Sequence, residues 1–594
     1  RQLIAMSVIS ALMNYDSTPH KRNFATSGIG GDIGVSLNMM LPQPVLSFGV
    51  SDADESKSAE LMALVDESVE EMLSEGFDAA LLDAVIASSE FSNSLTTEIS
   101  NLGFNISYVL SNWWATFGNT DYLNTFYEAL EDVKSGGTDY LEELVKVYVA
   151  DNNHAAVVTT VPEPGLIEKQ NKEFSDMLAA KKASMSQEEV SALVKETGEF
   201  NAWNSTEVDQ ELVKEIQAVT ISELPEEIKS YEVNDETVDG IRYLSAKANV
   251  GEIGSTSIMF DASSVPTYKL HYLNLYTYLL GKLPTEAYDQ NQVMVMQTRY
   301  LNSPSYYIGA IENGDDQFTP VLAMDWMGLM EDYQDSVNVA AEVLLNTDMS
   351  KVEEIYNLVN SARSMLRYQI VGNPLNIQIM RSTATYDDLM NYQAYMNGIE
   401  YYDFLGAVLE QLSTDSDVVV KELEGIRDMV MNRENMTVLF AGNDSGIETF
   451  RGSISGVIDQ VKQGSIVRQD YSDIPRPSSR EGIAIDTQVQ YNMLSASYDM
   501  LGVEFDGKYM PVAMFLKENY LYPQIRYMYG AYDMLLEFTD DYIVMGSYRD
   551  PNIDETYEVY EGIPEFLESM SELPQEYLDR YILNAYGNYT IPSG

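Results

Sequence analysis

The chain has 594 residues, 45% of them apolar and 22% charged, which is typical of globular proteins and predicts about four folded domains. Its net charge of −58 excludes a role in binding nucleic acid, because the phosphate backbone would be repelled. The absence of cysteine excludes disulfides, thiol nucleophiles and thiolate metal sites, and it leaves the redox compartment undetermined.

The first segment, from Arg1 to Ser17, is predicted to be a helix of the fold. It starts like a signal peptide but has no small-x-small cleavage site, and its apolar residues recur at helical spacing (Leu3, Met6, Met13). We therefore expect the natural N-terminus to lie upstream. No apolar run approaches the roughly eighteen residues that a membrane span needs, so no span is expected.

Alternating structure is predicted next. A Gly-rich turn (Ser27–Gly34) leads to strands near Val35 and Val45, and then to two long helices separated by Ser74–Asp78. Leu141–Val149 is predicted to be helical. The β-branched run Ala155–Val161 is predicted to be a buried strand.

The segment Pro162–Ser205 is charged and predicts two antiparallel helices that turn at Ala183–Ser186. Ser186 and Glu189 have the spacing of a capping box, just before an apolar run. A helical hairpin between globular parts indicates a hinge or a strut.

Further strands are predicted to start near Ile241, Ser255, Thr437, Met534 and Tyr542. The pattern of the N-terminal part recurs between Arg526 and Asp579, where Arg526–Phe538 reads as a turn and a strand. A helix, a loop and a strand in Leu141–Val161 recur in Leu423–Asn443. Repetition of one unit at wide spacing predicts duplicated α+β domains.

The motifs of common enzymes are missing. His20, His154 and His271 lie more than a hundred residues apart, with no spacing that presents two imidazoles to one zinc, so each is interpreted as structural. Asp315 and Asp316 could join a cation site, but solvated loop acids are the preferred interpretation.

Glycine-rich stretches do not form known nucleotide or nucleophile motifs. The turn with Gly28 and Gly30 has Ile33 at the third position of a dinucleotide fingerprint, and Gly452–Gly456 has Ile454 in place of a nucleophilic serine. No P-loop motif occurs.

Several stretches nevertheless resemble one known family. Tyr520–Met534 and Ser547–Leu567 resemble the "IR-x-x-G-G-A-Y-G" and "S-Y-R-D-P-N-x-x-E-T" segments of presequence proteases and falcilysin, in the pitrilysin–insulinase superfamily of zinc metallopeptidases. Ser17–Ile33 and Lys195–Thr206 are similar to the family's second domain and to the connection between its halves. The resemblance extends, in order, over essentially the whole chain.

The resemblance implies an α+β fold of duplicated sandwich domains, in two halves that close around a chamber for unfolded peptides. It implies a second, non-zinc domain at residues 1–161, incomplete at its start, and a helical linker at 162–235. A third domain would span residues 236–475, and a fourth, incomplete at its end, residues 476–594. Zinc would be held by an H-x-x-E-H helix in a first domain that this chain lacks, supplied in cis or by a separate chain.

The resemblance also implies two catalytic residues, because Arg526 and Tyr532 match a family pair that reaches across the chamber to the zinc site. A tyrosine hydroxyl can donate to the oxyanion of a tetrahedral intermediate, and a guanidinium adds a fixed fork of donors. The alternative is a strand-edge aromatic and a surface arginine. The sequence departs from the family at Tyr529 and Asp533, which stand where the motif has glycine.

Three functions remain open at this point. The chain could be the non-zinc portion of a peptidase, a catalytically inactive homologue that binds peptides or has a structural role, or an unrelated acidic extracellular binding module. The acidic charge would favour basic peptides, or it is simply a solvated surface suited to secretion or high salt. The abundance of Tyr, Asn and Asp leans toward an exported bacterial protein, but localisation is left open.

Overall fold

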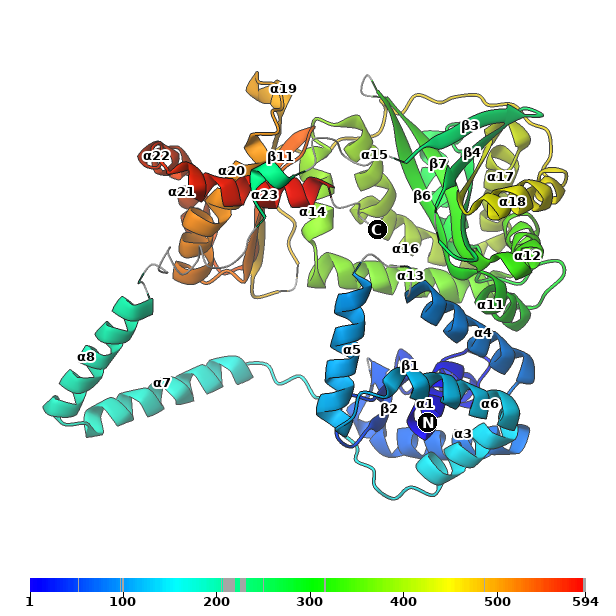
Figure 1. Ribbon diagram of the computed structural model, residues 1–594, viewed down its shortest axis with the longest axis horizontal. Helices are drawn as coiled ribbons and strands as arrows, with labels where there is room; N and C mark the ends of the chain where they lie inside the picture. The colour runs from blue at the N-terminus through cyan, green and yellow to red at the C-terminus, as the bar shows by residue number, and fades with distance from the viewer. Residues whose placement is uncertain are drawn as a thin grey trace.

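The computed structural model describes residues 1–590 apart from 52, 97, 99–100, 205, 207–218, 225–230, 249, 315–316 and 486. The chain is an α+β protein with N-terminal, central and C-terminal bodies, and with a helical arm that leaves the N-terminal body (Figure 1). Among the described residues, no helix combines the length and the apolar character that crossing a bilayer requires.

The N-terminal body packs helices around a short antiparallel hairpin of strands. Its elements, with η for helical segments that are not regular α-helix, are α1 (Gln2–Met13), α2 (Pro19–Ala25), β1 (Asp32–Asn38), β2 (Val45–Ser51), η1 (Glu55–Lys57), α3 (Ser58–Glu75), α4 (Ala79–Thr96), α5 (Leu102–Phe117), α6 (Tyr122–Val145) and η2 (Lys146–Ala150). The predicted first helix, both strands and both long helices are confirmed. Helix α1 lies at the centre of this core, because its apolar residues point inward almost all round.

Helix α1 and strand β1 are joined by a side chain that imitates a neighbouring strand. The amide of Asn14, just after α1, donates to the carbonyl of Val35 at 2.6 Å and accepts from the Val35 N–H at 2.9 Å. The backbone groups of a strand must be paired when they are buried, and here a side chain satisfies two of them.

The prediction of a buried strand at Ala155–Val161 is wrong. These residues form an exposed extended segment with no ladder partner, and Val158 is 85% exposed. A β-branched run favours the extended conformation, but a strand also needs a neighbour with free hydrogen-bonding groups. The echo of Leu141–Val161 in Leu423–Asn443 therefore fails in its strand.

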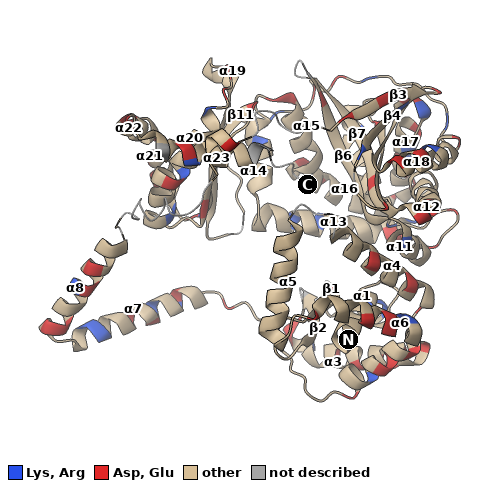
Figure 2. Cartoon of the chain, viewed as in Figure 1, with Lys and Arg blue, Asp and Glu red and all other residues tan. Residues whose placement is uncertain are grey.

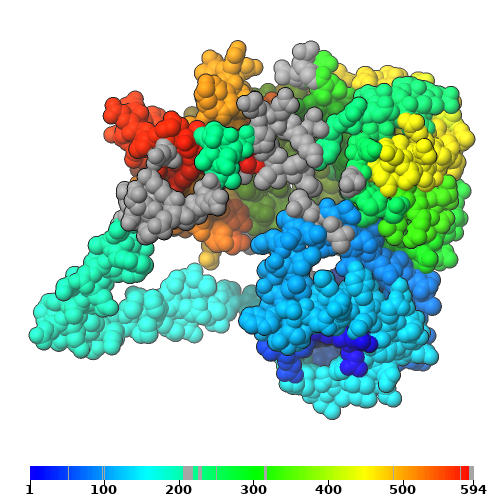
Figure 3. Space-filling view, in the orientation of Figure 1, coloured from blue at the N-terminus to red at the C-terminus, as the bar shows by residue number. Residues whose placement is uncertain are grey.

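The arm consists of α7 (Leu166–Ser184) and α8 (Gln187–Asn204), as predicted. The capping box is confirmed: the N–H of Glu189 donates to Ser186 Oγ at 3.2 Å, and the N–H of Ser186 donates to Glu189 Oε2 at 2.7 Å. The predicted packing of one helix against the other is wrong, because neither helix has a buried residue and the two diverge from the turn (Figure 1). In the space-filling view the arm stands clear of the bodies (Figure 3).

The central body is built on a mixed sheet with strand order β3-β4-β8-β5-β7-β6. Its elements, after η3 (Ile221–Glu223), are β3 (Val233–Val238), β4 (Ile241–Lys247), β5 (Ile253–Asp261), η4 (Thr267–Lys269), α10 (Leu270–Leu279), α11 (Gln290–Tyr300), β6 (Asn302–Gly314), β7 (Gln317–Leu329), η5 (Met330–Asp332), α12 (Tyr333–Asn346), α13 (Val352–Gly372), α14 (Leu375–Thr383), α15 (Asp388–Asn397), α16 (Ile399–Thr414), α17 (Ser416–Val430), η6 (Arg433–Asn435), β8 (Met436–Gly442) and α18 (Asp444–Ile458). Strand β8 pairs parallel with β4 and antiparallel with β5. The strands predicted near Ile241, Ser255 and Thr437 are confirmed as β4, β5 and β8.

The C-terminal body contains the antiparallel sheet β10-β11-β9, and its helices pack beside that sheet. Its elements are β9 (Gln490–Ser497), α19 (Tyr498–Leu501), α20 (Tyr509–Leu516), η7 (Lys517–Met528), β10 (Asp533–Phe538), β11 (Tyr542–Asp550), α21 (Asp554–Glu561), α22 (Ile563–Ser569) and α23 (Gln575–Thr590). The strands predicted near Met534 and Tyr542 are confirmed as β10 and β11. The interpretation of Arg526–Phe538 as a turn and a strand is corrected, because Arg526 to Met528 belong to the helix η7.

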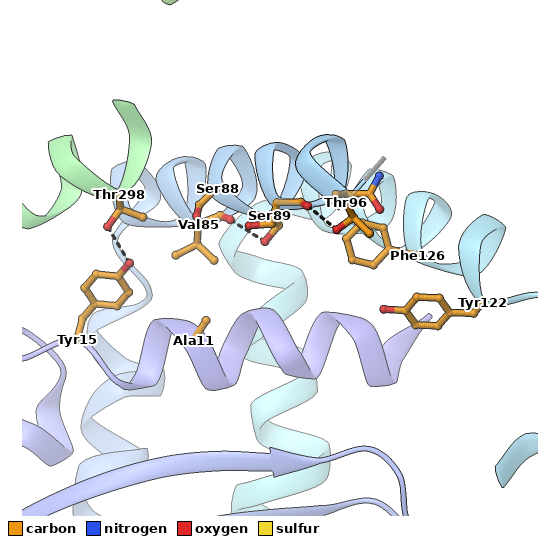
Figure 4. Close-up of a pocket in the computed structure, with 11 residues that line it drawn as sticks. Ala11, Tyr15, Val85, Ser88, Ser89, Thr96, Tyr122, Phe126 and Thr298 are labelled. Atoms are coloured by element: carbon orange, nitrogen blue, oxygen red, sulfur yellow. Dashed lines mark hydrogen bonds between the residues drawn. The ribbon is translucent and has the colours of Figure 1, made fainter. Parts of the chain in front are cut away.

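The bodies meet through polar contacts. Between the N-terminal and central bodies, Tyr15 Oη and Thr298 Oγ1 lie 3.0 Å apart beside a cavity of about 390 Å³, lined mostly by hydroxyl groups of α1, α4 and α6 (Figure 4). Between the central and C-terminal bodies, the Gln378 amide of α14 donates to the carbonyl of Tyr491 at 2.7 Å.

Candidate functional site

The candidate site lies where helix η7 ends and strand β10 begins. Pro523 stands inside η7, where it lacks an N–H and its ring crowds the preceding turn. The helix widens in response: the N–H of Tyr529 donates to the carbonyl of Gln524, five residues earlier, at 3.0 Å. Widened turns of this kind are frequent at functional sites because they redirect the side chains that follow.

The turn after η7 depends on one glycine. Gly530 has φ +82°, in the left-handed region that favours glycine. Tyr529, which replaces the first glycine of the family motif, has φ −98° and a helical conformation, so this position does not require glycine. The N–H of Tyr532 then donates to the carbonyl of Tyr548 at 3.0 Å, which fixes where the strand begins.

The structure brings Arg526 and Tyr532 together on the surface. The Arg526 guanidinium carbon lies 5.8 Å from the centre of the Tyr532 ring and 5.7 Å from that of Tyr522. Tyr532 is 63% exposed, and Arg526 is exposed as well. Among the described residues, no carboxylate lies within ion-pair distance of the Arg526 guanidinium, so its N–H donors remain open to a ligand.

Tyrosine rings surround this pair in a way that sequence reasoning missed. The Tyr532 ring meets Tyr548 edge-on at 6.0 Å, and Tyr548 meets Tyr491 at 5.2 Å. Burial and the neighbouring Asp533 raise the pKa of Tyr522. The sheet and η7 bring these tyrosines together from three elements; the only signal in the sequence is the total of 41 tyrosines.

The three histidines lie apart. His20 is buried against Phe48, His154 lies in an exposed loop with Nδ1 3.1 Å from the Gln43 amide, and His271 stacks on Tyr395 with Nε2 2.9 Å from its carbonyl oxygen. Over the part of the chain that the structure describes, no three His, Asp or Glu side chains are grouped to hold a metal ion. The residues present therefore do not fit a zinc site. Asp315 and Asp316 lie outside the described residues.

Comparison with protein families identifies two matching regions. A family of segments associated with peptidase family M16, subfamily C, matches residues 161–408, and one described as "PreP C-terminal domain" matches residues 480–592. The second match contains the whole candidate site.

Curated relatives match almost the whole chain. Protein HypA of Clostridium perfringens is 24% identical over 99% of this chain and 61% of its own length. Presequence protease 1, chloroplastic/mitochondrial, of Arabidopsis thaliana is 21% identical over 99% of this chain and 56% of its own length. The chain thus spans about three fifths of the length of these relatives.

Solved structures include similar folds. A peptidase M16 inactive domain from Pseudomonas fluorescens is 13% identical, with a TM-score of 0.43 over 61% of this chain and 84% of that one. The periplasmic protease PqqL of Escherichia coli is 13% identical, with a TM-score of 0.41 over 98% of this chain and 62% of that one. From the family matches and the curated relatives together, the chain belongs to the pitrilysin superfamily of peptidases, as a presequence-protease-like member.

Proposed function

We propose that this chain is the non-zinc portion of a zinc metalloendopeptidase that degrades unstructured oligopeptides in a closed chamber. Zinc would be held by ligands outside this chain, in a domain supplied in cis or by a separate chain. The observation that carries the proposal is the exposed Arg526–Tyr532 pair, within the segment that matches the PreP C-terminal domain.

The pair has the chemistry to stabilise an oxyanion. The Tyr532 hydroxyl can donate one hydrogen bond to the oxygen that becomes negative when a peptide carbonyl is attacked. The guanidinium of Arg526 offers a planar fork of donors to the same oxygen or to a neighbouring peptide carbonyl. Its position beside the Tyr532 ring keeps these two groups on one side of the turn.

The charge of the molecule supports basic peptides as preferred substrates. Asp and Glu side chains lie over all three bodies and the arm (Figure 2), and 93 acidic residues face 35 Lys and Arg. A field of this sign attracts cationic peptides over distances of about 8–10 Å at physiological salt. The cleavage rate of a basic peptide should therefore fall with added salt more steeply than that of a neutral peptide.

The test is steady-state peptide cleavage by the complete protein, zinc domain included. Tyr532→Phe should lower kcat about 100- to 1,000-fold and leave KM nearly unchanged, because the hydroxyl acts in the transition state and little in the ground state. Arg526→Lys should also lower kcat, since a point charge on a flexible stem does not reproduce the planar fork.

Tyr527→Phe is the matched control. Tyr527 is the neighbouring residue to Arg526 on η7 and is 73% exposed. The same loss of a phenolic hydroxyl should leave kcat unchanged there, and none of the variants should change Tm, because these side chains lie on the surface. Wild-type kcat in the Tyr532→Phe protein would contradict the proposal.

The second candidate is a catalytically inactive homologue that binds peptides. The observation in its favour is Asp533, which places a negative charge next to Tyr532, where the family motif has glycine. A complete protein that binds an unstructured peptide at micromolar concentration and leaves it intact, with and without added zinc, would support this candidate and contradict the first.

A further inference from the structure

The segment that follows Tyr548 contains a fully buried carboxylate. Asp550, at the end of β11, is 0% exposed. Its two oxygens accept from the Thr556 hydroxyl at 2.6 Å, the Asn552 N–H at 2.9 Å and the Asn492 amide at 3.3 Å. A buried carboxylate is costly unless such donors surround it, so this network holds the end of the strand in one arrangement.

Strand β11 is distorted just before this carboxylate. It advances from Ser547 to Asp550 while its partner β9 moves only from Asn492 to Gln490, which is a β-bulge. Arg549, inside the bulge, has φ +48°, a strained conformation for a residue with a side chain. Bulges redirect side chains, and this one includes Tyr548, whose carbonyl and ring both contact Tyr532.

Asn552 joins the buried carboxylate to the turn that precedes Tyr532. Its side-chain Nδ2 donates to the carbonyl of Tyr529 at 2.8 Å and lies 3.3 Å from Asp550 Oδ1. An amide NH₂ has two hydrogens, so one can serve each acceptor. Tyr529 is the last residue before Gly530, whose left-handed conformation turns the chain toward Tyr532.

We propose that Asn552 is a positioning residue: it anchors the Tyr529–Tyr532 turn to the buried Asp550 and so fixes the Tyr532 hydroxyl beside Arg526. This inference rests on the proposed function for its effect on catalysis. The placement of Tyr532 itself is a property of the fold and can be measured separately.

The kinetic test is a double-mutant cycle in the complete protein. Asn552→Ala should lower kcat about 10- to 100-fold with KM nearly unchanged, because a displacement of about 1 Å can cost that much. Asn552→Asp, which keeps the shape but cannot donate, should lower kcat at least as far. In the Tyr532→Phe background, Asn552→Ala should change kcat by less than about two-fold, because its effect acts through the lost hydroxyl.

The structural test is ¹⁹F NMR of the same protein with 3-fluorotyrosine at position 532 only. Wild type should give one dominant resonance, and Asn552→Ala should shift or split it. Asn519→Ala is the control, because Asn519 is hydrogen-bonded to Tyr577 and Tyr581 in the same body and does not contact the turn. It should lower Tm and leave both the resonance and kcat unchanged.

The outcomes separate the two proposals. Wild-type kcat in Tyr532→Phe, with a shifted resonance in Asn552→Ala, would reject the catalytic role and keep the positioning role. An unchanged resonance, or additive losses in the double mutant, would overturn the positioning role alone. If Asn552→Ala does not fold, Asn552→Ser gives the same comparison, because its hydroxyl is too short to reach the Tyr529 carbonyl.

Discussion

His20 should make the stability of the N-terminal body depend on pH between about 4 and 6.5. The imidazole is 1% exposed, meets the Phe48 ring edge-on at 5.8 Å, and has no hydrogen-bond partner at Nε2 among the described residues. Burial, followed by the nearby Lys21 charge, lowers the pKa of His20 from 6.5 to about 4. The folded protein thus holds this histidine neutral.

The magnitude follows from the two pKa values. Below pH 6.5 the unfolded chain takes up a proton that the folded chain refuses until about pH 4, so the free energy of unfolding falls as pH falls through this window. Each pKa unit corresponds to about 1.4 kcal/mol, so the window contains about 3 kcal/mol, and between pH 8 and pH 4.5 the loss is about 2–3 kcal/mol. Above pH 6.5 the contribution is fully present.

The assay compares wild type with His20→Leu, a substitution of similar volume that cannot take up a proton. Urea denaturation at pH 8 and pH 4.5, followed by pulsed hydrogen exchange of peptides from α1, reports on the N-terminal body alone. Carboxylates elsewhere weaken both proteins in acid, but wild type should lose about 2–3 kcal/mol more than the variant. Parallel losses in the two proteins would refute the interpretation of a buried, neutral His20.

Three further predictions concern other parts of the chain. Tyr333→Phe should cost about 1–3 kcal/mol in urea denaturation, because it leaves the buried Thr256 hydroxyl, now 2.7 Å from the Tyr333 oxygen, without a partner; adding Thr256→Val should restore part of that loss. Arg381→Met should destabilise the central body by about 1–2 kcal/mol in the same assay, since the guanidinium joins two partly exposed glutamates from different segments. Limited trypsin digestion should cut first at Lys181 or Lys182 in the exposed arm, as read by mass spectrometry; first cuts elsewhere would contradict the exposure of the arm.

Local patterns were sufficient to predict much of the fold. The strands near Val35, Ile241 and Thr437 alternate apolar and polar residues over a few positions, and the structure places strands there. The capping box at Ser186 and Glu189 was predictable because its hydrogen bonds join residues three apart. The domain boundaries stay predictions.

Features that depend on distant partners were not predictable in this way. The long hairpin of β6 and β7 was missed, because Pro304 and Pro320 interrupt the strand pattern, yet proline is accepted at sheet edges and irregularities. Ala155–Val161 has the composition of a strand but no partner. The Arg526–Tyr532 pair followed from a resemblance to a family, whereas the surrounding tyrosines needed the structure, since β9, β11 and η7 supply them.

The position of β8 in the central sheet has a consequence for how the chain folds. Strand β8, at Met436–Gly442, lies between β4 and β5, which precede it by about 180 residues. On the ribosome, β4 and β5 therefore wait with open hydrogen-bonding edges until residue 442 has emerged, about 10–40 s later at ordinary rates of synthesis. Exposed strand edges are sites of mispairing with other chains. The central body should accordingly be the part of this protein whose folding benefits most from a chaperone.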